Sequence, residues 1–429
     1  MGILIDESKK VFKLNSIIEK RILIFLNFFG VSVFILMLKL NPLKNSDGYI
    51  WESLGNNFFK NIGSSDAQHR PLFGFIAYLI SLPLRIIPLD FNLTLYNAGA
   101  VDHLKNTIIS GTSAKVIIAY LISNLIFYIM SINLAFFTAK LLVKDNLTSL
   151  IFASLVAISG EFISWMSDIP IMIQGTFIIY ISLFMFALFL NQENDSKRQK
   201  LARSAGLVYG ILMLGKAEYN ILISVILVSI IFYRKKIRFL IIFVYSQFLP
   251  LFIWILALVF TTGGYKVYEI KRDTSDPYSI TNYWSQILDF DNFTSMSNLL
   301  FTRPIHGGLS STFNGIGLIS TIAILVFIGY LIASTRKEIG IAVFLYLFVT
   351  FYFLYLVNFM IPRHSYEVAW IGYLGLSLAL ANLIRLKIFK INFIRAVFLA
   401  LIFSVIFYSN WLRYPVIVGI PHSLELPLF

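Results

Sequence analysis

The sequence predicts an all-α polytopic membrane protein with about eleven transmembrane helices. Of its 429 residues, 58% are hydrophobic, and the mean hydropathy is +0.79. Apolar runs of about twenty residues, the length a helix needs to cross a bilayer, recur along the whole chain. The 41 Phe and 22 Tyr residues also suit a lipid environment.

The apolar runs give the expected helices in order. They lie at 21–40, 71–89, 116–137, 147–163, 169–190, 204–215, 217–233, 239–260, 314–334, 339–361, 366–383 and 394–410. The first run lacks a small-residue cleavage site after it and is interpreted as a retained signal-anchor. The chain has no Cys, which excludes disulfides and Cys-ligated metals.

The distribution of Lys and Arg predicts the topology. Basic clusters occur in the N-terminal 20 residues and at 197–203, 234–238, 336–338 and 385–390. Cytoplasmic loops are rich in Lys and Arg, so we expect all five clusters to face the cytoplasm. This explains the net charge of +13 without a nucleic-acid partner. Segment 71–89, with Pro71, Pro83, Arg85 and Pro88, is then expected not to cross, but to be interfacial or re-entrant.

This topology divides the chain into five parts. Residues 1–20 form a cytoplasmic N-terminus, and 21–260 form a transmembrane module whose first outer loop is 41–115. Residues 261–313 form a long outer loop, 314–410 the C-terminal transmembrane helices, and 411–429 an outer tail. No internal repeat or low-complexity tract is visible.

The stretch "GKAEYN" is the most unusual place in the membrane region. It puts Lys216 and Glu218 within about thirty otherwise mostly apolar residues, where charges are costly unless they face a cavity or each other. Two interpretations fit: two short helices that meet at a polar outer vestibule, or one bent helix.

The polar residues of the predicted outer side suggest a chemical site there. They are Asp47, Glu52, His69, Arg70, Asp168, Lys216, Glu218, Tyr265, Tyr268, Arg363 and His364. Each also has a purely structural interpretation. Asp47 and Glu52 could be solvated loop residues, and Asp168 could cap the following helix. Lys216 could pair with Glu218, and Arg363 and His364 could be interfacial anchors.

The order of these features resembles the GT-C class of polytopic glycosyltransferases, of the protein mannosyltransferase and aminoarabinose transferase type. The quoted matches are Asp47 in "SDGYIWESL", the juxtamembrane start "HRPLFGFIAYLI", Asp168 in "WMSDIPIMIQGTF", "LGKAEYNIL", and Arg363 in "IPRHSYEVAWIGYLGL". The resemblance covers residues 20–235 in order and is weaker beyond them.

The resemblance implies a donor and roles for the residues. The donor would be a polyprenyl-phosphate-linked sugar, and the acceptor a glycan, lipid or protein hydroxyl. Asp47 and Asp168 would be catalytic. Lys216, Arg363, His364, Arg70 and His69 would bind the donor phosphate, and Glu52, Glu218, Tyr265 and Tyr268 the acceptor or sugar. A single acid replaces the usual acidic pair at Asp47, which leaves a divalent metal open.

Two other functions remain open from the residues. A lipid-linked polysaccharide polymerase or ligase would also use outer cations and a long outer loop. A transporter would place charges near mid-membrane and often shows inverted repeats, which are not seen here. The composition, rich in Asn and Ile and free of Cys, favours a bacterium with AT-rich DNA, and hence an inner membrane protein. The distribution of charges predicts a cytoplasmic N-terminus and a site on the outer face.

Overall fold

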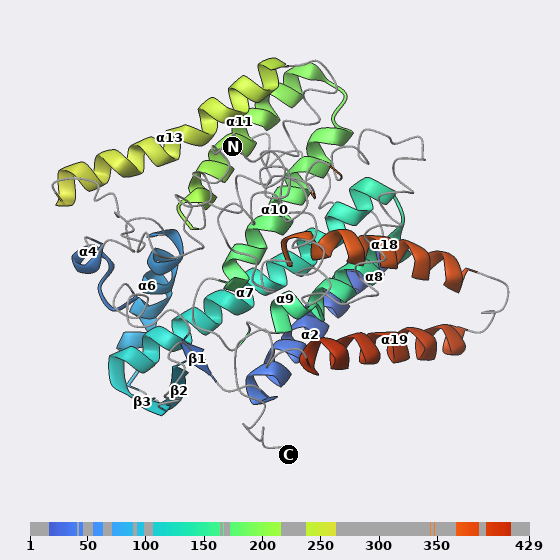
Figure 1. Cartoon of the computed structure of the whole chain (residues 1–429), viewed down its shortest axis with the longest axis horizontal. Coiled ribbons are helices and arrows are strands. Elements are labelled where there is room, and N and C mark those ends of the chain that lie inside the picture. Colours follow the sequence, from blue (N-terminus) through green and yellow to red (C-terminus); the bar gives the residue numbers. More distant parts are fainter. Residues whose placement is uncertain are drawn as a thin grey trace, which may run out of the picture. The chain divides into compact units, whose positions relative to one another are not determined.

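The computed structural model describes the helical framework of the chain (Figure 1). It covers residues 17–40, 43–45, 55–62, 71–88, 92–97, 106–163, 166, 172–215, 237–262, 344, 347, 366–385 and 392–412. The chain divides into two compact units. The first comprises 1–221, 236–266 and 380–429, and the second 222–235 and 267–379. Nearly all the described elements belong to the first unit.

Most of the expected helices form where the apolar runs lie. Among the described residues, four helices are long and apolar enough to cross a membrane by length and composition: Glu19–Leu40, Gly111–Val143, Ile173–Asn191 and Ile237–Phe260. They belong to α2 (Ile17–Leu40), α7 (Gly111–Val143), α10 (Met172–Asn191) and α13 (Ile237–Thr262). Shorter apolar stretches occur in α6 (Pro71–Ile86), α8 (Asn146–Ala157), α18 (Tyr366–Ile384) and α19 (Asn392–Leu412).

The number of spans stays a prediction. The expected helices at 217–233 and 314–334 lie outside the described residues, as does nearly all of 339–361. The long outer loop at 261–313 and the tail at 411–429 also lie outside them, apart from residues 261–262 and 411–412.

Helix α7 is the longest described element and orders its neighbours. Its 33 residues correspond to about 50 Å, well beyond the roughly 30 Å of a bilayer core. Helix α2 runs antiparallel to it. Glu19 pairs with Lys140 at 2.7 Å, and Asn133 Nδ2 donates to Asn27 Oδ1 at 2.7 Å. Farther along α2, the rings of Phe34 and Tyr128 lie 6.1 Å apart.

Helix α10 runs parallel to α7 on another side. Asn191 at its end donates to the carbonyl of Leu141 at 3.1 Å, and the rings of Phe177 and Phe127 lie 4.9 Å apart. Near its start, Gln174 donates to Ser123 and Asn124. Since α2 also ends near this level, the first part of α7, from Gly111 to about Tyr120, projects beyond α2 and α10.

Helix α6 packs along the first half of α7, between Lys115 and Phe127. Phe73 near the start of α6 contacts Phe127, with ring centroids 5.6 Å apart. Just beyond its end, the carbonyl of Ile87 accepts from Lys115 Nζ at 2.7 Å. Helix α6 is therefore antiparallel to α7, and its 16 residues, about 24 Å, are fewer than a membrane span needs. It lies where the non-crossing segment 71–89 was expected.

A small β-sheet corrects the expectation of a purely helical chain. It contains β1 (Lys44–Asn45), β2 (Leu93–Asn97) and β3 (Asn106–Ile109) in that order. Strand β1 is parallel to β2, and β2 is antiparallel to β3. Apolar run length alone did not predict these strands, because alternating or β-branched stretches such as "LTLY" and "NTII" are too short to register.

Helix α11 (Asp195–Met213) packs closely against α13 through two glycines. A Cβ on Gly206 would meet the backbone of Phe243 and Gln247, and one on Gly210 would meet Pro250. Small residues four apart allow such a close approach between apolar helices. The two helices run parallel. The stretch "GKAEYN" lies outside the described residues, so both interpretations of it stay open.

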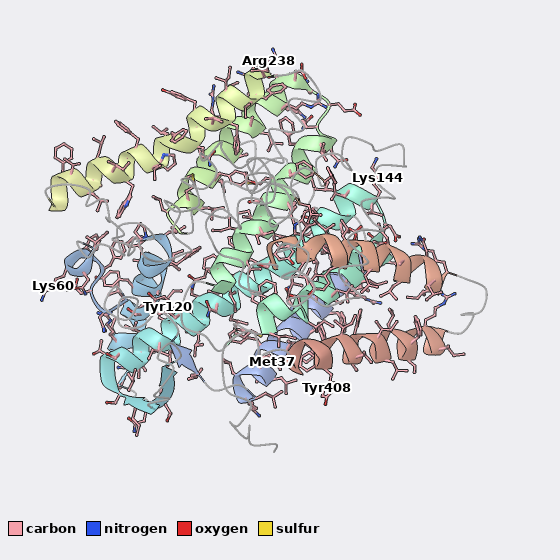
Figure 2. The ribbon with its side chains drawn as sticks, viewed as in Figure 1. Met37, Lys60, Tyr120, Lys144, Arg238 and Tyr408 are labelled. Carbon is pink, nitrogen blue, oxygen red and sulfur yellow. The ribbon has the colours of Figure 1, made fainter. Side chains whose placement is uncertain are left out.

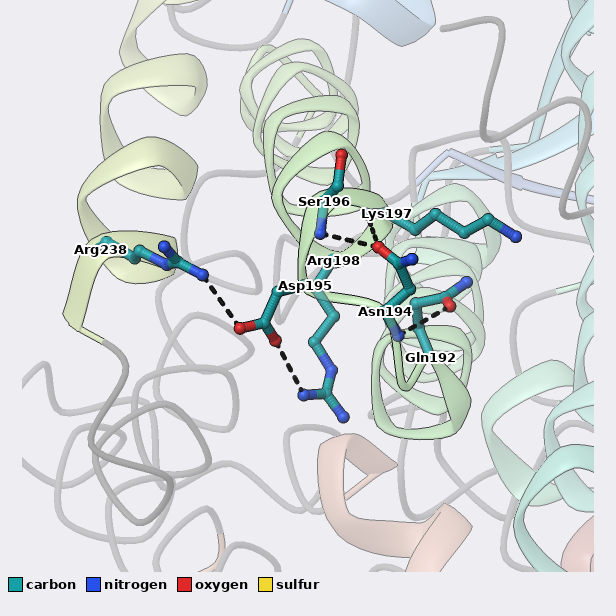
Figure 3. A network of polar contacts seen from close by, with 7 residues as sticks. All are labelled: Gln192, Asn194, Asp195, Ser196, Lys197, Arg198 and Arg238. Carbon is teal, nitrogen blue, oxygen red and sulfur yellow. Dashed lines mark hydrogen bonds and ion pairs between the residues drawn. The ribbon is translucent and has the colours of Figure 1, made fainter.

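Ion pairs gather at the helix ends predicted to be cytoplasmic. Asp195, in the first turn of α11, pairs with Arg198 at 3.3 Å and with Arg238 of α13 at 3.0 Å (Figure 3). Asn194 caps α11 by accepting from two backbone N–H groups. This cap starts the helix nine residues before the expected apolar run at 204. The pairs agree with the predicted topology, which itself stays a prediction.

A further ion pair connects the turn between α7 and α8 with the residue that follows α18. Arg385 approaches Asp145 to 2.5 Å, and Asp145 also caps α8 through Thr148. Partial burial alone would raise the pKa of Asp145, but the hydrogen bonds from Thr148 and Arg385 outweigh burial. The pKa of Asp145 therefore lies below its ordinary value.

Replacing Asp145 should have a pH-dependent effect on stability. Because folding lowers its pKa, the ionised carboxylate stabilises the fold above the ordinary Asp pKa, and this contribution is lost as the pH falls through the folded-state pKa. Asp145→Ala should cost about 1–2 kcal/mol near pH 7 through the lost cap and ion pair. Asp145→Asn keeps a capping oxygen and should cost less. Thermal melting in detergent from pH 7 to pH 3 measures this; a pH-independent difference from wild type would contradict it.

Candidate active site

All eleven predicted site residues lie outside the described part of the chain. This holds for Asp47, Glu52, His69, Arg70, Asp168, Lys216, Glu218, Tyr265, Tyr268, Arg363 and His364. The structure therefore neither brings them together nor separates them. It does describe positions that lie close to several of them in the sequence.

The chain positions beside Arg70 and Lys216 are joined directly. The backbone N–H of Leu72 donates to the carbonyl of Leu214 at 3.1 Å. Gly215 lies against the ring of Phe73, where an added Cβ would collide. The start of α6 and the end of α11 therefore form one junction. The two basic residues sit within two positions of this bonded pair in sequence.

Gly55, the first described residue after Asp47 and Glu52, is held by hydrogen bonds and by packing. Arg85 Nη2 donates to the carbonyl of Gly55 at 2.6 Å and to Ser81 Oγ at 2.9 Å, and Ser81 Oγ itself lies 3.3 Å from the Gly55 carbonyl. On the other side, a Cβ on Gly55 would collide with Val116 of α7 and reach Tyr120. Figure 2 labels Tyr120 near this end of α7 and Lys144 at the opposite end. Gly55 is thus held between α6 and α7.

An aromatic cluster holds α4 (Phe58–Asn61) against α6. The ring of Phe58 lies 5.1 Å from Phe75 and 6.5 Å from Tyr78, and Phe59 lies 6.0 Å from Tyr78. The Arg85 guanidinium lies 5.6 Å from the Tyr78 ring, a cation–π distance. The cluster and the Arg85 hydrogen bonds together make α4, α6 and Gly55 one packed group.

Lys115 at the start of α7 is a buried cation. Its side chain is 9% exposed, and its ammonium donates to the carbonyl of Ile87 at 2.7 Å. Within the described ranges, no carboxylate pairs with Lys115 or Arg85. Sequence reasoning treated Arg85 only as an argument against crossing and did not single out Lys115 or Gly55. The signal that could have found the two cations is their position within the predicted outer loop 41–115, one in the apolar segment 71–89 and one just before the apolar run at 116.

The segment containing Asp168 lies between two buried anchors. Met166 is fully buried, and its N–H donates to Phe162 of the short helix α9 (Gly160–Ile163) at 3.0 Å. Gln174 follows at the start of α10, also fully buried, with its amide N–H groups used by Ser123 and Asn124. The described helix begins at Met172, later than the expected 169.

The described contacts next to the predicted site residues lie along the first half of α7, between Val116 and Phe127. Gly55 packs against Val116 and Tyr120 of α7. At the α6–α11 junction, Gly215 packs against Phe73, whose ring contacts Phe127 of α7. These levels are seven to eleven residues apart on α7, roughly 10–16 Å. That separation is of the order of a phosphosugar head group. The ion pairs of Lys140, Asp145 and Asp195 gather at the ends predicted to face the other side.

Within the described ranges no group of three or more His, Cys, Asp or Glu could hold a metal. The predicted carboxylates, Asp47 and Asp168, lie outside those ranges, so a metal at them is not tested.

Comparison with solved structures identifies the fold. The Archaeoglobus fulgidus oligosaccharyltransferase in complex with Zn and sulfate matches 93% of this chain with a TM-score of 0.55 and 14% identity. The same enzyme tethered with an acceptor peptide containing the NVT sequon matches 94%, with a TM-score of 0.52 and 12% identity. The chain has the GT-C fold. The predicted resemblance is therefore confirmed for the fold, and the chain is an integral membrane protein.

The GT-C likeness is one of architecture rather than sequence. The chain spans about half the length of the oligosaccharyltransferase, 53% and 55% in the two structures. ArnT from Cupriavidus metallidurans in the apo state matches 85% of this chain and is itself covered to 60%, with a TM-score of 0.49 and 12% identity. No family model and no curated protein sequence matches the chain.

Proposed function

We propose that this chain is a membrane glycosyltransferase that moves a sugar from a polyprenyl-phosphate carrier to an acceptor hydroxyl on the outer face of a bacterial inner membrane. The GT-C fold supports a transferase over a transporter. The observation that carries the proposal further is the junction between α6 and α11. It joins the chain next to Arg70 to the chain next to Lys216 through the Leu72–Leu214 hydrogen bond.

The proposed chemistry needs one base and a cationic phosphate site. Asp47 would accept the proton of the acceptor hydroxyl as it attacks the anomeric carbon. Arg70 and Lys216, with His69, Arg363 and His364, would stabilise the departing phosphate. Asp168 would orient the acceptor or share the role of base. Glu52, Glu218, Tyr265 and Tyr268 would contact the sugar or acceptor.

The lipid tail of the donor would lie against the apolar helices. Helix α13 exposes Tyr245, Phe248 and Phe252 among other large apolar side chains, which in a membrane protein face lipid or a lipid ligand. A carrier embedded in the outer leaflet would then present its phosphate at the level of the α6–α11 junction. This proposed position of the donor is the same whether the acceptor is a glycan, a lipid or a protein.

Transfer assays with synthetic donors test the function. Purified protein in lipid nanodiscs should release free polyprenyl phosphate from a polyprenyl-phosphate hexose or pentose when cell-envelope extract supplies the acceptor. Heat-inactivated protein and a water-soluble nucleotide sugar are the controls. If turnover occurs with the nucleotide sugar and not with any lipid-linked donor, the proposed donor class is wrong.

A second candidate is transfer of an oligosaccharide from a lipid pyrophosphate, as in a polysaccharide polymerase or ligase. The observation in its favour is that the fold neighbour with TM-scores of 0.55 and 0.52 is an oligosaccharyltransferase. The same assay separates the two candidates, because release of polyprenyl pyrophosphate in place of the monophosphate would favour the second.

A further inference from the structure

We propose that the parallel helices α11 and α13 form a binding surface for one anionic phospholipid. The surface, which we call the α11–α13 surface, consists of Arg203, Leu207, Ile211, Arg238, Leu249 and Ile253. Its two cations lie near the starts of the helices, at the opposite end of α11 from the α6–α11 junction. The inference does not rest on the proposed sugar transfer.

The starts of α11 and α13 lie at one end of the helix bundle. Asn191 at the end of α10 donates to the carbonyl of Leu141 near the end of α7 at 3.1 Å, and Asn194 caps α11 three residues later. The ring centroid of Phe189 of α10 lies 6.0 Å from that of Phe239 at the start of α13. The predicted topology places this end at the cytoplasmic leaflet, which carries anionic phospholipids.

Two arginines provide the cationic part of the surface. Arg203 is exposed, and the side chain of Arg238 is 61% exposed. The carboxylate of Asp195 is shared between Arg238 and Arg198 (Figure 3), so a single negative charge faces two guanidinium groups there. A guanidinium presents several N–H donors in a planar fork, which suits the oxygens of a phosphate.

The two arginines lie at nearly the same depth. Gly206, three residues after Arg203, lies against the carbonyl of Phe243, five residues after Arg238. Since the helices run parallel, the two arginine positions differ by the rise of about two residues, roughly 3 Å along the axes. A phosphate that contacts the pair of helices at this depth is therefore within reach of both long side chains.

On α11 the charge gives way to apolar surface along one face. Leu207 and Ile211 follow Arg203 at intervals of four residues, so the three side chains lie on one face of the helix. Leu207 is half-buried, and Ile211 is 43% exposed. Arg203 and Ile211 are about 12 Å apart along the axis, within the half-thickness of the hydrocarbon core, about 15 Å. A phospholipid carries its phosphate and its acyl chains in this order.

Helix α13 adds a matching apolar flank. The contact at Gly206 and Gly210 brings the two helices close together. At about 100° per residue, Leu249 and Ile253 lie on the flank of α13 that adjoins the Ile211 face of α11, and they are 45% and 57% exposed. An acyl chain there would bury apolar area against both helices. A soluble anion or an acidic protein would use only the arginines, so the surface fits a phospholipid best.

Lipid titrations followed by native mass spectrometry test the surface. Wild-type protein in detergent should bind phosphatidylglycerol more tightly than zwitterionic phosphatidylcholine. Arg203→Gln should weaken phosphatidylglycerol binding about fivefold, because a cation near the membrane surface contributes about that factor. The double variant Arg203→Gln/Arg238→Gln should weaken it about 25-fold by the same reasoning. Binding of phosphatidylcholine should stay unchanged in both variants.

The matched control is Lys144→Gln. Lys144 is an exposed cation at the end of α7, at the same end of the bundle but outside the α11–α13 surface (Figure 2). This variant should bind phosphatidylglycerol as the wild type does. Equal affinity in the wild type and the double variant, or the same loss in Lys144→Gln, would overturn the inference.

A second measurement separates a phospholipid from a free anion. Added phosphatidylglycerol should raise the Tm of the wild type in detergent, because it binds the folded protein. The rise should be smaller in Ile211→Ser, in which the acyl chain loses apolar contact. Glycerol 3-phosphate has the phosphate but no acyl chain and should not raise the Tm at the same concentration. An equal rise with glycerol 3-phosphate, or an undiminished rise in Ile211→Ser, would reject a phospholipid as the ligand.

Discussion

Asp47→Asn should reduce sugar transfer by about 10²- to 10⁴-fold, the contribution that a positioned general base makes. Asn has nearly the shape of Asp but cannot accept the proton of the attacking hydroxyl at neutral pH. The structure describes both flanks of the segment: Asn45 pairs with Asn97 of β2, and the carbonyl of Gly55 accepts from Arg85 of α6. Single-turnover assays with lipid-phosphate sugar measure the loss.

The matched control for this variant is Asp66→Asn, in the same predicted outer loop but without an assigned role. It should transfer at the wild-type rate. Both proteins should melt within about 2 °C of wild type, because neither change removes a described contact. Full activity in Asp47→Asn would remove this carboxylate from the mechanism and make a solvated loop residue the better interpretation.

Removal of a phosphate-binding cation should raise the donor requirement. Lys216→Ala, Arg70→Ala and Arg363→Ala should each raise KM for the donor about 10- to 100-fold, because a charge-assisted contact contributes about 1.5–3 kcal/mol. Two positions from Arg70 and Lys216 in the sequence, Leu72 and Leu214 are hydrogen-bonded to each other. Donor titrations at saturating acceptor measure the effect.

The control for the cation series is Lys200, in the helix α11 that precedes Lys216 in the sequence. Lys200 is exposed near the opposite end of α11, and Lys200→Ala should leave KM unchanged. If Lys216→Ala and Arg70→Ala both keep the wild-type KM, the junction does not mark the phosphate site. In that case the pairing of Lys216 with Glu218 becomes the better interpretation of "GKAEYN".

The sequence predicted the apolar helices well where hydrophobicity alone defines them. Helices α10 and α13 lie within three residues of the expected 169–190 and 239–260. Helix α7 is longer than the expected 116–137, because its polar ends extend beyond the apolar run. Helix α11 starts early because its basic first turns are amphipathic and are held by the Asn194 cap. Apolar run length detects neither feature.

The framework of the predicted site could be anticipated only in part. The sequence suggested a juxtamembrane element at 71–89 and a break at Lys216, and the structure joins their described neighbours at Leu72 and Leu214. It could not suggest that Arg85 binds the carbonyl of Gly55, because that contact depends on how α6 lies along α7. Such contacts arise from tertiary packing and leave no periodic pattern in the sequence.

The most direct measurement is an experimental structure in nanodiscs with a bound polyprenyl-phosphate sugar. The phosphate should lie at the α6–α11 junction within contact of Lys216 or Arg70. The Asp47 carboxylate should face the anomeric carbon, on the side of the membrane opposite the Asp145–Arg385 pair. Asp47 on the same side as that pair, or tens of ångströms from the phosphate, would contradict the proposed active site.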